Sequence, residues 1–368
     1  MIAIIVISIL LLNSTFSMLT VLLPLLIFQI DNSTAQVELV LMMFMVFLLI
    51  TRIILLLKQY DFKKFLIIGS LTYCLGFLIL VFTNEIFMYY IGAGLFGFSF
   101  AILTPLLLTY LSRILKNATT IYNLLIAFSA AVSPLIGEKI YLQNGDSITL
   151  IWLFVSVLCL LLNFLIAIKS PTIERIDNDT HGITKNTITI FKEILIALLL
   201  ISIPYGAIIT YLPLYFSNTS YSVGMFYSLF WLSYAVASYI NHKVTSLFGK
   251  EKIKITSILF MIISLILLVF MGNKLLIYVS SILFGFGFGS IFNVYYDEVS
   301  MIKNDFEKNN GYAIIGLMSY VGVGIAPMIL FSFSKNLGHT FLVSIIFLAI
   351  AIGYSIRITT LRERRLRN

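Results

Sequence analysis

Apolar residues gather in twelve continuous stretches along the chain, and short polar segments separate them. The stretches cover residues 2–28, 37–57, 65–83, 86–112, 119–142, 148–168, 194–216, 222–240, 255–272, 275–297, 311–333 and 340–358. About 20 continuous apolar residues are the length a helix needs to cross a bilayer, whereas a membrane-spanning strand is shorter and alternates apolar with polar residues. The pattern therefore predicts an all-α integral membrane protein with twelve transmembrane helices.

The longest polar interruption divides these stretches into two sets of six. It covers residues 169–193, which read KSPTIERIDNDTHGITKNTITIFKE. We therefore expect an N-terminal six-helix bundle over residues 1–168, a central cytoplasmic loop over 169–193, and a C-terminal six-helix bundle over 194–368 that ends in a short basic tail.

Composition agrees with the membrane assignment, and the distribution of charge gives an orientation. Hydrophobic residues make up 60% of the chain, charged residues 11%, and mean hydropathy is +1.04. The polar segments after the second, fourth, sixth, eighth and tenth stretches are basic, whereas the opposite set contains only Lys139, Lys274 and Lys335. Because cytoplasmic loops are enriched in Lys and Arg, we expect a plasma-membrane protein with both termini cytoplasmic. Topology thus explains the net charge of +8 without a nucleic-acid partner.

The two sets of stretches resemble each other in sequence. TVLLPL at residues 20–25 recurs as TYLPL at 210–214, and LFGFSF at 95–100 recurs as LFGFGF at 283–288, in each case about 190 residues later. Each half has six spans, so both copies begin on the same side of the membrane. A parallel repeat of this kind predicts two bundles related by a pseudo-twofold axis along the membrane normal, with a cavity between them.

Two motifs resemble those of the major facilitator superfamily. Arg52 and the segment KQYDFKK at residues 58–64 resemble the family motif GxxxDRxGRK, although Lys58 stands where the family has an acidic residue and Asp61 where it has glycine. The segment SAAVSPLIGE at residues 129–138 resembles GxxxGPxxGG, which is typical of the family's exporters. The resemblance implies an inner gate and a flexible kink in the fifth span. The gate residues would be Arg52, Lys58, Asp61, Lys63 and Lys64, and the kink residues Ser133, Pro134 and Gly137.

Polar residues within the spans are candidates for a substrate cavity. Asn13, Ser17 and Thr20 recur at helical spacing in the first span, so they share one face of a helix. Lipid offers such groups no partner, so this face should point into a bundle or toward water. The full candidate set is Asn13, Ser17, Thr20, Tyr205, Thr210, Tyr211, Asn293, Tyr296 and Tyr320. The alternatives are helix packing through small residues and, for the tyrosines, an interfacial aromatic belt.

Ionisable residues are scarce within the spans, which limits the choice of a proton-carrying group. Glu138, beside the proline and glycine of the fifth span, is the best candidate proton site, and the alternative is a surface pair with Lys139. Cys74 and Cys159 both lie within apolar stretches, and the histidines lack metal-ligand spacing. We expect no cofactor, no metal and no catalytic residue.

Together these features predict a secondary active transporter that works as a monomer in the lipid bilayer. The expected function is proton-coupled export of a small organic molecule, such as a drug-like compound or a metallophore, by alternating access. An importer of a small solute is the alternative within the class. A glycan flippase or polymerase of an envelope pathway, or a sensor of the same fold, are alternatives from other classes. The short outer loops and the absence of a phosphate-binding motif disfavour an enzyme.

Overall fold

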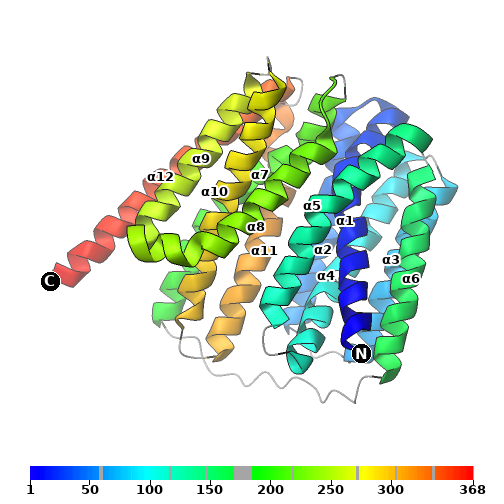
Figure 1. The fold of residues 1–368 in the computed structure, drawn as a ribbon, viewed down its shortest axis with the longest axis horizontal. Coiled ribbons are helices and arrows are strands. Elements are labelled where there is room, and N and C mark those ends of the chain that lie inside the picture. The colour runs from blue at the N-terminus through cyan, green and yellow to red at the C-terminus, as the bar shows by residue number, and fades with distance from the viewer. Residues whose placement is uncertain are drawn as a thin grey trace. The chain divides into compact units, whose positions relative to one another are not determined.

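A computed structural model describes residues 1–57, 61–83, 85–115, 118–145, 147–169, 185–217, 219–270, 273–302, 305–333 and 336–367. Within these ranges the chain forms twelve α-helices and one short 3-10 turn, and every α-helix contains a segment long and apolar enough to cross a membrane. The prediction of twelve membrane-spanning helices is therefore confirmed (Figure 1).

The helices follow the predicted apolar stretches closely. The first six are α1 (Ile2–Asp31), α2 (Thr34–Leu57), α3 (Phe62–Phe82), α4 (Ile86–Ile114), α5 (Ala118–Asn144) and α6 (Ser147–Lys169). The last six are α7 (Lys185–Phe216), α8 (Val223–Phe248), α9 (Lys250–Val269), α10 (Lys274–Ser300), α11 (Asp305–Leu330) and α12 (Leu337–Arg367), with the 3-10 turn at Phe331–Phe333. Several helices extend beyond the apolar stretches because polar residues at a helix end can reach the headgroup region.

The helices form two compact units. The first contains α1–α6 and also Phe216–Ser228, which is the connection between α7 and α8 together with the start of α8. The second contains α7 as far as Tyr215 and the chain from Leu229 onward. The sequence predicted that all of residues 194–368 form the second bundle. The grouping of residues 216–228 with α1–α6 could not be predicted from the apolar pattern.

Within each unit, a glycine brings two helices into very close contact. In the first unit, a Cβ atom added to Gly97 of α4 would lie 2.1 Å from the carbonyl oxygen of Phe44 on α2. In the second, a Cβ atom added to Gly285 of α10 would lie 2.1 Å from the carbonyl oxygen of Phe230 on α8. Both glycines come from the repeated LFGF sequence, so the internal repeat of the sequence corresponds to the same helix contact in both units.

Candidate functional site

The polar face of α1 bonds mainly to its own backbone. Asn13 is buried and its side-chain amide donates to the carbonyl oxygen of Ile9 at 2.8 Å. Thr20 donates to the carbonyl oxygen of Ser17 at 3.0 Å, and Ser17 is itself buried. Such bonds satisfy the donors of Asn13 and Thr20 without a second helix, as the packing alternative requires.

The corresponding residues of α7 lie among aromatic rings and include unpaired hydroxyls. The half-buried Tyr205 stacks on Phe230 of α8 at a ring-centroid distance of 5.5 Å and lies 4.6 Å from the ring of Phe288 on α10. Thr210 and Ser202 are almost fully buried, and in the described ranges neither hydroxyl has a hydrogen-bond partner. Each of these two hydroxyls therefore lacks the hydrogen bond that a buried polar group ordinarily has.

The remaining cavity candidates lie on α7, α10 and α11. The Asn293 side-chain amide donates to the hydroxyl of Ser238 on α8 at 2.7 Å and to the carbonyl oxygen of Gly289 at 2.6 Å. Tyr296 on α10 and Tyr320 on α11 are half-buried, whereas Tyr211 on α7 is fully buried. The structure thus brings Tyr205 into an aromatic cluster and pairs Asn293 with α8.

The expected inner gate divides into two places in the first unit. The Arg52 guanidinium of α2 donates to the Thr104 hydroxyl of α4 at 2.5 Å. Asp61 instead caps α3, where its carboxylate accepts the backbone N–H groups of Lys63 and Lys64 at 2.9 and 3.2 Å. Lys64 is largely exposed and lies 4.0 Å from Asp61, while Lys58 falls outside the described residues.

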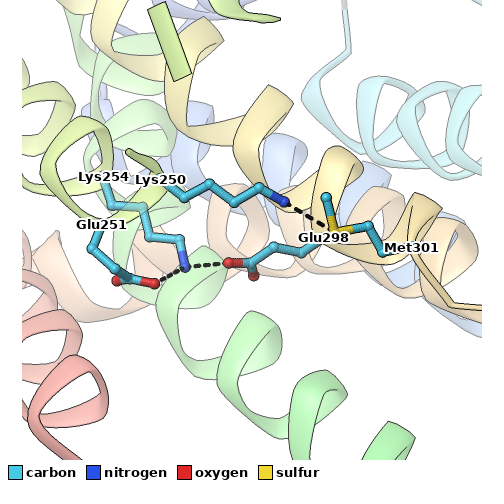
Figure 2. Close-up of polar contacts among 5 residues, drawn as sticks. All are labelled: Lys250, Glu251, Lys254, Glu298 and Met301. Carbon is cyan, nitrogen blue, oxygen red and sulfur yellow. Dashed lines mark hydrogen bonds and ion pairs between the residues drawn. The ribbon is translucent and has the colours of Figure 1, made fainter. Parts of the chain in front are cut away.

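A buried ion cluster lies at the start of α9 and is absent from the set of residues predicted to be functional. The Lys254 side chain is only 5% exposed, and its ammonium group lies 2.6 Å from the Glu298 carboxylate of α10 and 3.3 Å from that of Glu251 (Figure 2). It also lies 5.0 Å from the centre of the Tyr295 ring, a cation–π contact. Glu193 of α7 and Tyr354 of α12 line a small recess beside it.

Two sequence features could have revealed this cluster. Glu251 and Lys254 are three residues apart, so they share a helix face, and Glu298 lies in the last turn of the otherwise apolar α10. The positive-inside rule accounted for Lys254 by topology alone and so concealed its burial. A lysine that extends to water has little need of two carboxylates, whereas a buried one needs them.

The carboxylate of Glu138 binds the start of α8 rather than Lys139. One oxygen accepts the Val223 N–H at 2.7 Å, and the other accepts the Gly224 N–H at 3.0 Å and the Ser222 hydroxyl. Lys139 is exposed, and the ion pairs in the described part of the chain include none between it and Glu138. The surface pair that we considered for Glu138 is therefore absent from this structure.

The residues expected to form the kink in α5 are buried against neighbouring elements. Pro134 lies inside α5 and cannot donate a backbone hydrogen bond there. A Cβ atom on Gly137 would lie 3.0 Å from Met18 of α1, which shows how closely α5 and α1 pack. Ser133 is also buried. Ser133, Pro134 and Gly137 thus form a tightly packed turn of α5 that lacks one backbone hydrogen bond, directly before Glu138 in the sequence.

Comparison with known proteins agrees with this architecture. A family model described as Major Facilitator Superfamily matches residues 5–327. No curated protein matches the sequence. The fold is similar to that of the nucleoside transporter NupG, with a TM-score of 0.76 and 12% identity over 97% of this chain and 99% of that one.

Two further solved structures show the same fold. The POT family transporter PepTSo has a TM-score of 0.79 and 11% identity over 100% of this chain and 98% of that one. The human organic anion transporter MFSD10 has a TM-score of 0.66 and 10% identity over 94% of this chain and 98% of that one. Identities this low establish the fold and not the substrate, whereas the family match spans most of the sequence. The chain therefore belongs to the major facilitator superfamily.

Proposed function

We propose that the protein is a secondary active transporter that exports a small organic molecule across the plasma membrane by alternating access, with both termini cytoplasmic. Membership of a transporter superfamily supports this reading, as does the internal repeat, because its two copies make the same glycine contact in the two units. The substrate is a drug-like compound or a metallophore, protons drive its movement, and the monomer is the working unit.

The observation that carries the proposal is the combination of aromatic rings and unpaired hydroxyls on α7. A ring system of a substrate can pack against Tyr205, which already stacks with Phe230, and a polar edge can bond to Thr210. None of the rings in this cluster carries a charge, which suits a molecule that is planar and mainly apolar. Export is favoured over import by the proline and glycine of α5, the pattern that resembles the family's exporters.

Transport assays in everted and right-side-out vesicles test the function and its direction. A panel of fluorescent planar compounds and metallophores is offered to both vesicle types, with and without an imposed pH gradient. An exporter accumulates its substrate in everted vesicles, and a proton uncoupler abolishes that accumulation. Accumulation only in right-side-out vesicles would show an importer, and accumulation that survives the uncoupler would exclude proton coupling.

Matched tyrosine variants test the substrate site. Tyr205→Ala removes a ring that stacks within the second unit, and we expect it to raise KM for a planar substrate about tenfold. Tyr239→Ala is the control, because Tyr239 lies on α8 and is 86% exposed. Equal KM values for the two variants would argue against a substrate site at Tyr205.

A further inference from the structure

The start of α8 is held by a side chain from another helix. The first N–H groups of an α-helix have no partner within the helix and need one from elsewhere. In α8 the N–H groups of Val223 and Gly224 donate to Glu138, and that of Met225 donates to the Ser222 hydroxyl at 3.0 Å. Glu138 therefore supplies two of the three caps and, through Ser222, also positions the third.

The fit between α5 and α8 at this point depends on a glycine. A Cβ atom on Gly224 would lie 2.7 Å from the carbonyl oxygen of Pro134 and 2.8 Å from the Glu138 carboxylate. Any larger residue would push the first turn of α8 away from α5. Gly224 and the carboxylate are thus two independent requirements for the same contact.

This contact belongs to the first unit, whereas the chain on both sides of it belongs to the second. Phe216–Ser228 groups with α1–α6, but α7 up to Tyr215 and α8 from Leu229 do not. A short segment of chain between two parts of the second unit is consequently anchored to α5 by Glu138. Residues 216–228 contain no Asp, Glu, Lys, Arg or His, and Glu138 supplies a charged partner to three of their donors.

The chemistry of the anchor makes it sensitive to a proton. All three groups that face the carboxylate donate hydrogen bonds, and the positive end of the α8 dipole lies beside it. A proton on either oxygen removes the negative charge and places a donor where an acceptor is needed. The protonated acid cannot keep all three bonds, so the first turn of α8 loses at least one cap.

Few other titratable groups lie on the elements around Glu138. The charged residues on the helices that pack against α5 lie at helix ends: Asp31 on α1, Arg113 on α4 and Lys169 on α6. On α5 itself the neighbour is Lys139, and α8 carries His242 and Lys243 toward its other end. The tyrosines are Tyr89, Tyr90 and Tyr110 on α4, Tyr122 and Tyr141 on α5, and Tyr221 and Tyr227 beside or within the first turns of α8, while α6 also carries Cys159. In the described residues Glu138 is thus the carboxylate best placed to change the state of this segment.

We propose that Glu138 is a proton-operated clasp, which holds the first turn of α8 against α5 when ionised and releases it when protonated. The clasp stands on this geometry alone. Its use as the step that couples protons to transport rests on the proposed function.

Hydrogen–deuterium exchange of the full-length protein in lipid nanodiscs tests the clasp without a substrate. The Val223 and Gly224 amides are followed by mass spectrometry in peptides that cover the start of α8, with rates corrected for intrinsic exchange. The two conditions are neutral pH and about pH 3.5, which lies below the ordinary titration range of a glutamate side chain. The expected result for the wild type is protection at neutral pH and about tenfold faster corrected exchange at the lower pH. Unchanged protection between the two conditions would overturn the proposal.

Three variants sharpen the test. Glu138→Gln should exchange rapidly under both conditions, because an amide has only one acceptor oxygen and adds donors. Gly224→Ala keeps the Glu138 carboxylate but places a Cβ atom in the space that the carboxylate occupies. The exchange rate of this variant should therefore also lose its pH dependence. Glu85→Gln is the control, since Glu85 precedes α4 and its side chain caps nothing, so it should behave as the wild type. A Glu138→Gln variant as protected as the wild type at neutral pH would refute the clasp.

The exchange and transport assays can fail separately. An exchange result that refutes the clasp would not contradict the proposal that the protein transports a substrate through the α7 site. Failure of every substrate in vesicles would leave the exchange result standing. Should both succeed, Glu138→Gln should weaken the dependence of transport on the pH gradient, while Glu85→Gln should not.

Discussion

The starts of α3 and α9 occupy the same place in the two copies of the repeat, yet they are built from opposite chemistry. Counted from the first residue of each helix, Leu66 of α3 matches Lys254 of α9, and Tyr110 of α4 matches Glu298 of α10. In the first unit these positions are apolar and buried, and Phe62 lies 5.4 Å from Tyr110 between ring centroids. In the second unit they form the buried ion cluster around Lys254.

The difference teaches that the repeat preserves helix contacts more strictly than it preserves charges. The glycine contacts of Gly97 and Gly285 are the same in both units, since a carbonyl oxygen fills the space of a missing side chain. By contrast, the space between the ends of two neighbouring helices can be filled either by uncharged side chains or by an ion pair of similar volume. The apolar solution tolerates the loss of one member, whereas the ionic one leaves a buried charge unpaired.

Breaking the ion cluster should produce the largest effect. Lys254→Met removes the cation and leaves the Glu298 carboxylate, only 12% exposed, without its 2.6 Å partner. We expect this to destabilise the second unit by about 3–5 kcal/mol. Thermal unfolding in detergent, followed through Trp231 in a Trp152→Phe background, would measure the change in that unit.

Two further variants show whether the loss comes from the unpaired charge. Lys64→Met removes the exposed lysine beside Asp61 in the first unit and should cost less than about 1 kcal/mol. Lys254→Leu combined with Glu298→Tyr copies Leu66 and Tyr110 into the second unit and should restore most of the stability. If the double variant were as unstable as Lys254→Met, the loss would have to come from packing or from the remaining Glu251 carboxylate, and not from Glu298.

Filling the glycine contacts should produce an intermediate effect that is equal in the two units. Gly97→Ala and Gly285→Ala each place a Cβ atom 2.1 Å from a backbone carbonyl oxygen, so the helices must separate. Each change should cost about 1–3 kcal/mol, measured by thermal unfolding. Gly353→Ala in α12 is the control, because a Cβ atom there meets nothing within 4 Å. Clearly unequal costs at Gly97 and Gly285 would show that the two contacts are not equivalent.

The repeated helix contacts could be recognised in the sequence because they depend on local residue types. The length of each apolar stretch sets a span, and the LFGF sequence marks a close contact in both halves. The twelve spans and the paired glycines could therefore be predicted.

The partners of charged residues could not be predicted in the same way. Glu138 and Val223 are far apart in the chain, as are Lys254 and Glu298, and no spacing rule links residues on different helices. The alternative considered for Glu138 was a pair with its sequence neighbour Lys139, whereas the donors that its carboxylate binds lie at the start of α8. Hydrogen-bond partners of this kind depend on how helices cross, which hydrophobic periodicity does not specify.

The caps of α3 and α9 should produce the smallest effect and sharpen the comparison furthest. Asp61 caps α3 with its side chain, whereas α9 begins after Gly249, which has a φ of 84° and makes no side-chain cap. Asp61→Ala should cost about 1 kcal/mol, because two N–H groups lose their acceptor. Gly249→Ala should cost a similar ~1 kcal/mol for a different reason, since a side chain strains a positive φ.

Asparagine distinguishes the two causes. Asp61→Asn keeps a cap and should restore most of the stability lost in Asp61→Ala. Gly249→Asn should be as costly as Gly249→Ala, because asparagine tolerates the left-handed helical region but not the combination of φ 84° and ψ 148° that Gly249 adopts. Unfolding midpoints of the four variants, read through Trp152 for α3 and Trp231 for α9, provide the measurement. If Gly249→Asn were as stable as the wild type, backbone strain would not be what selects glycine before α9, and the two helix starts would differ only in their side chains.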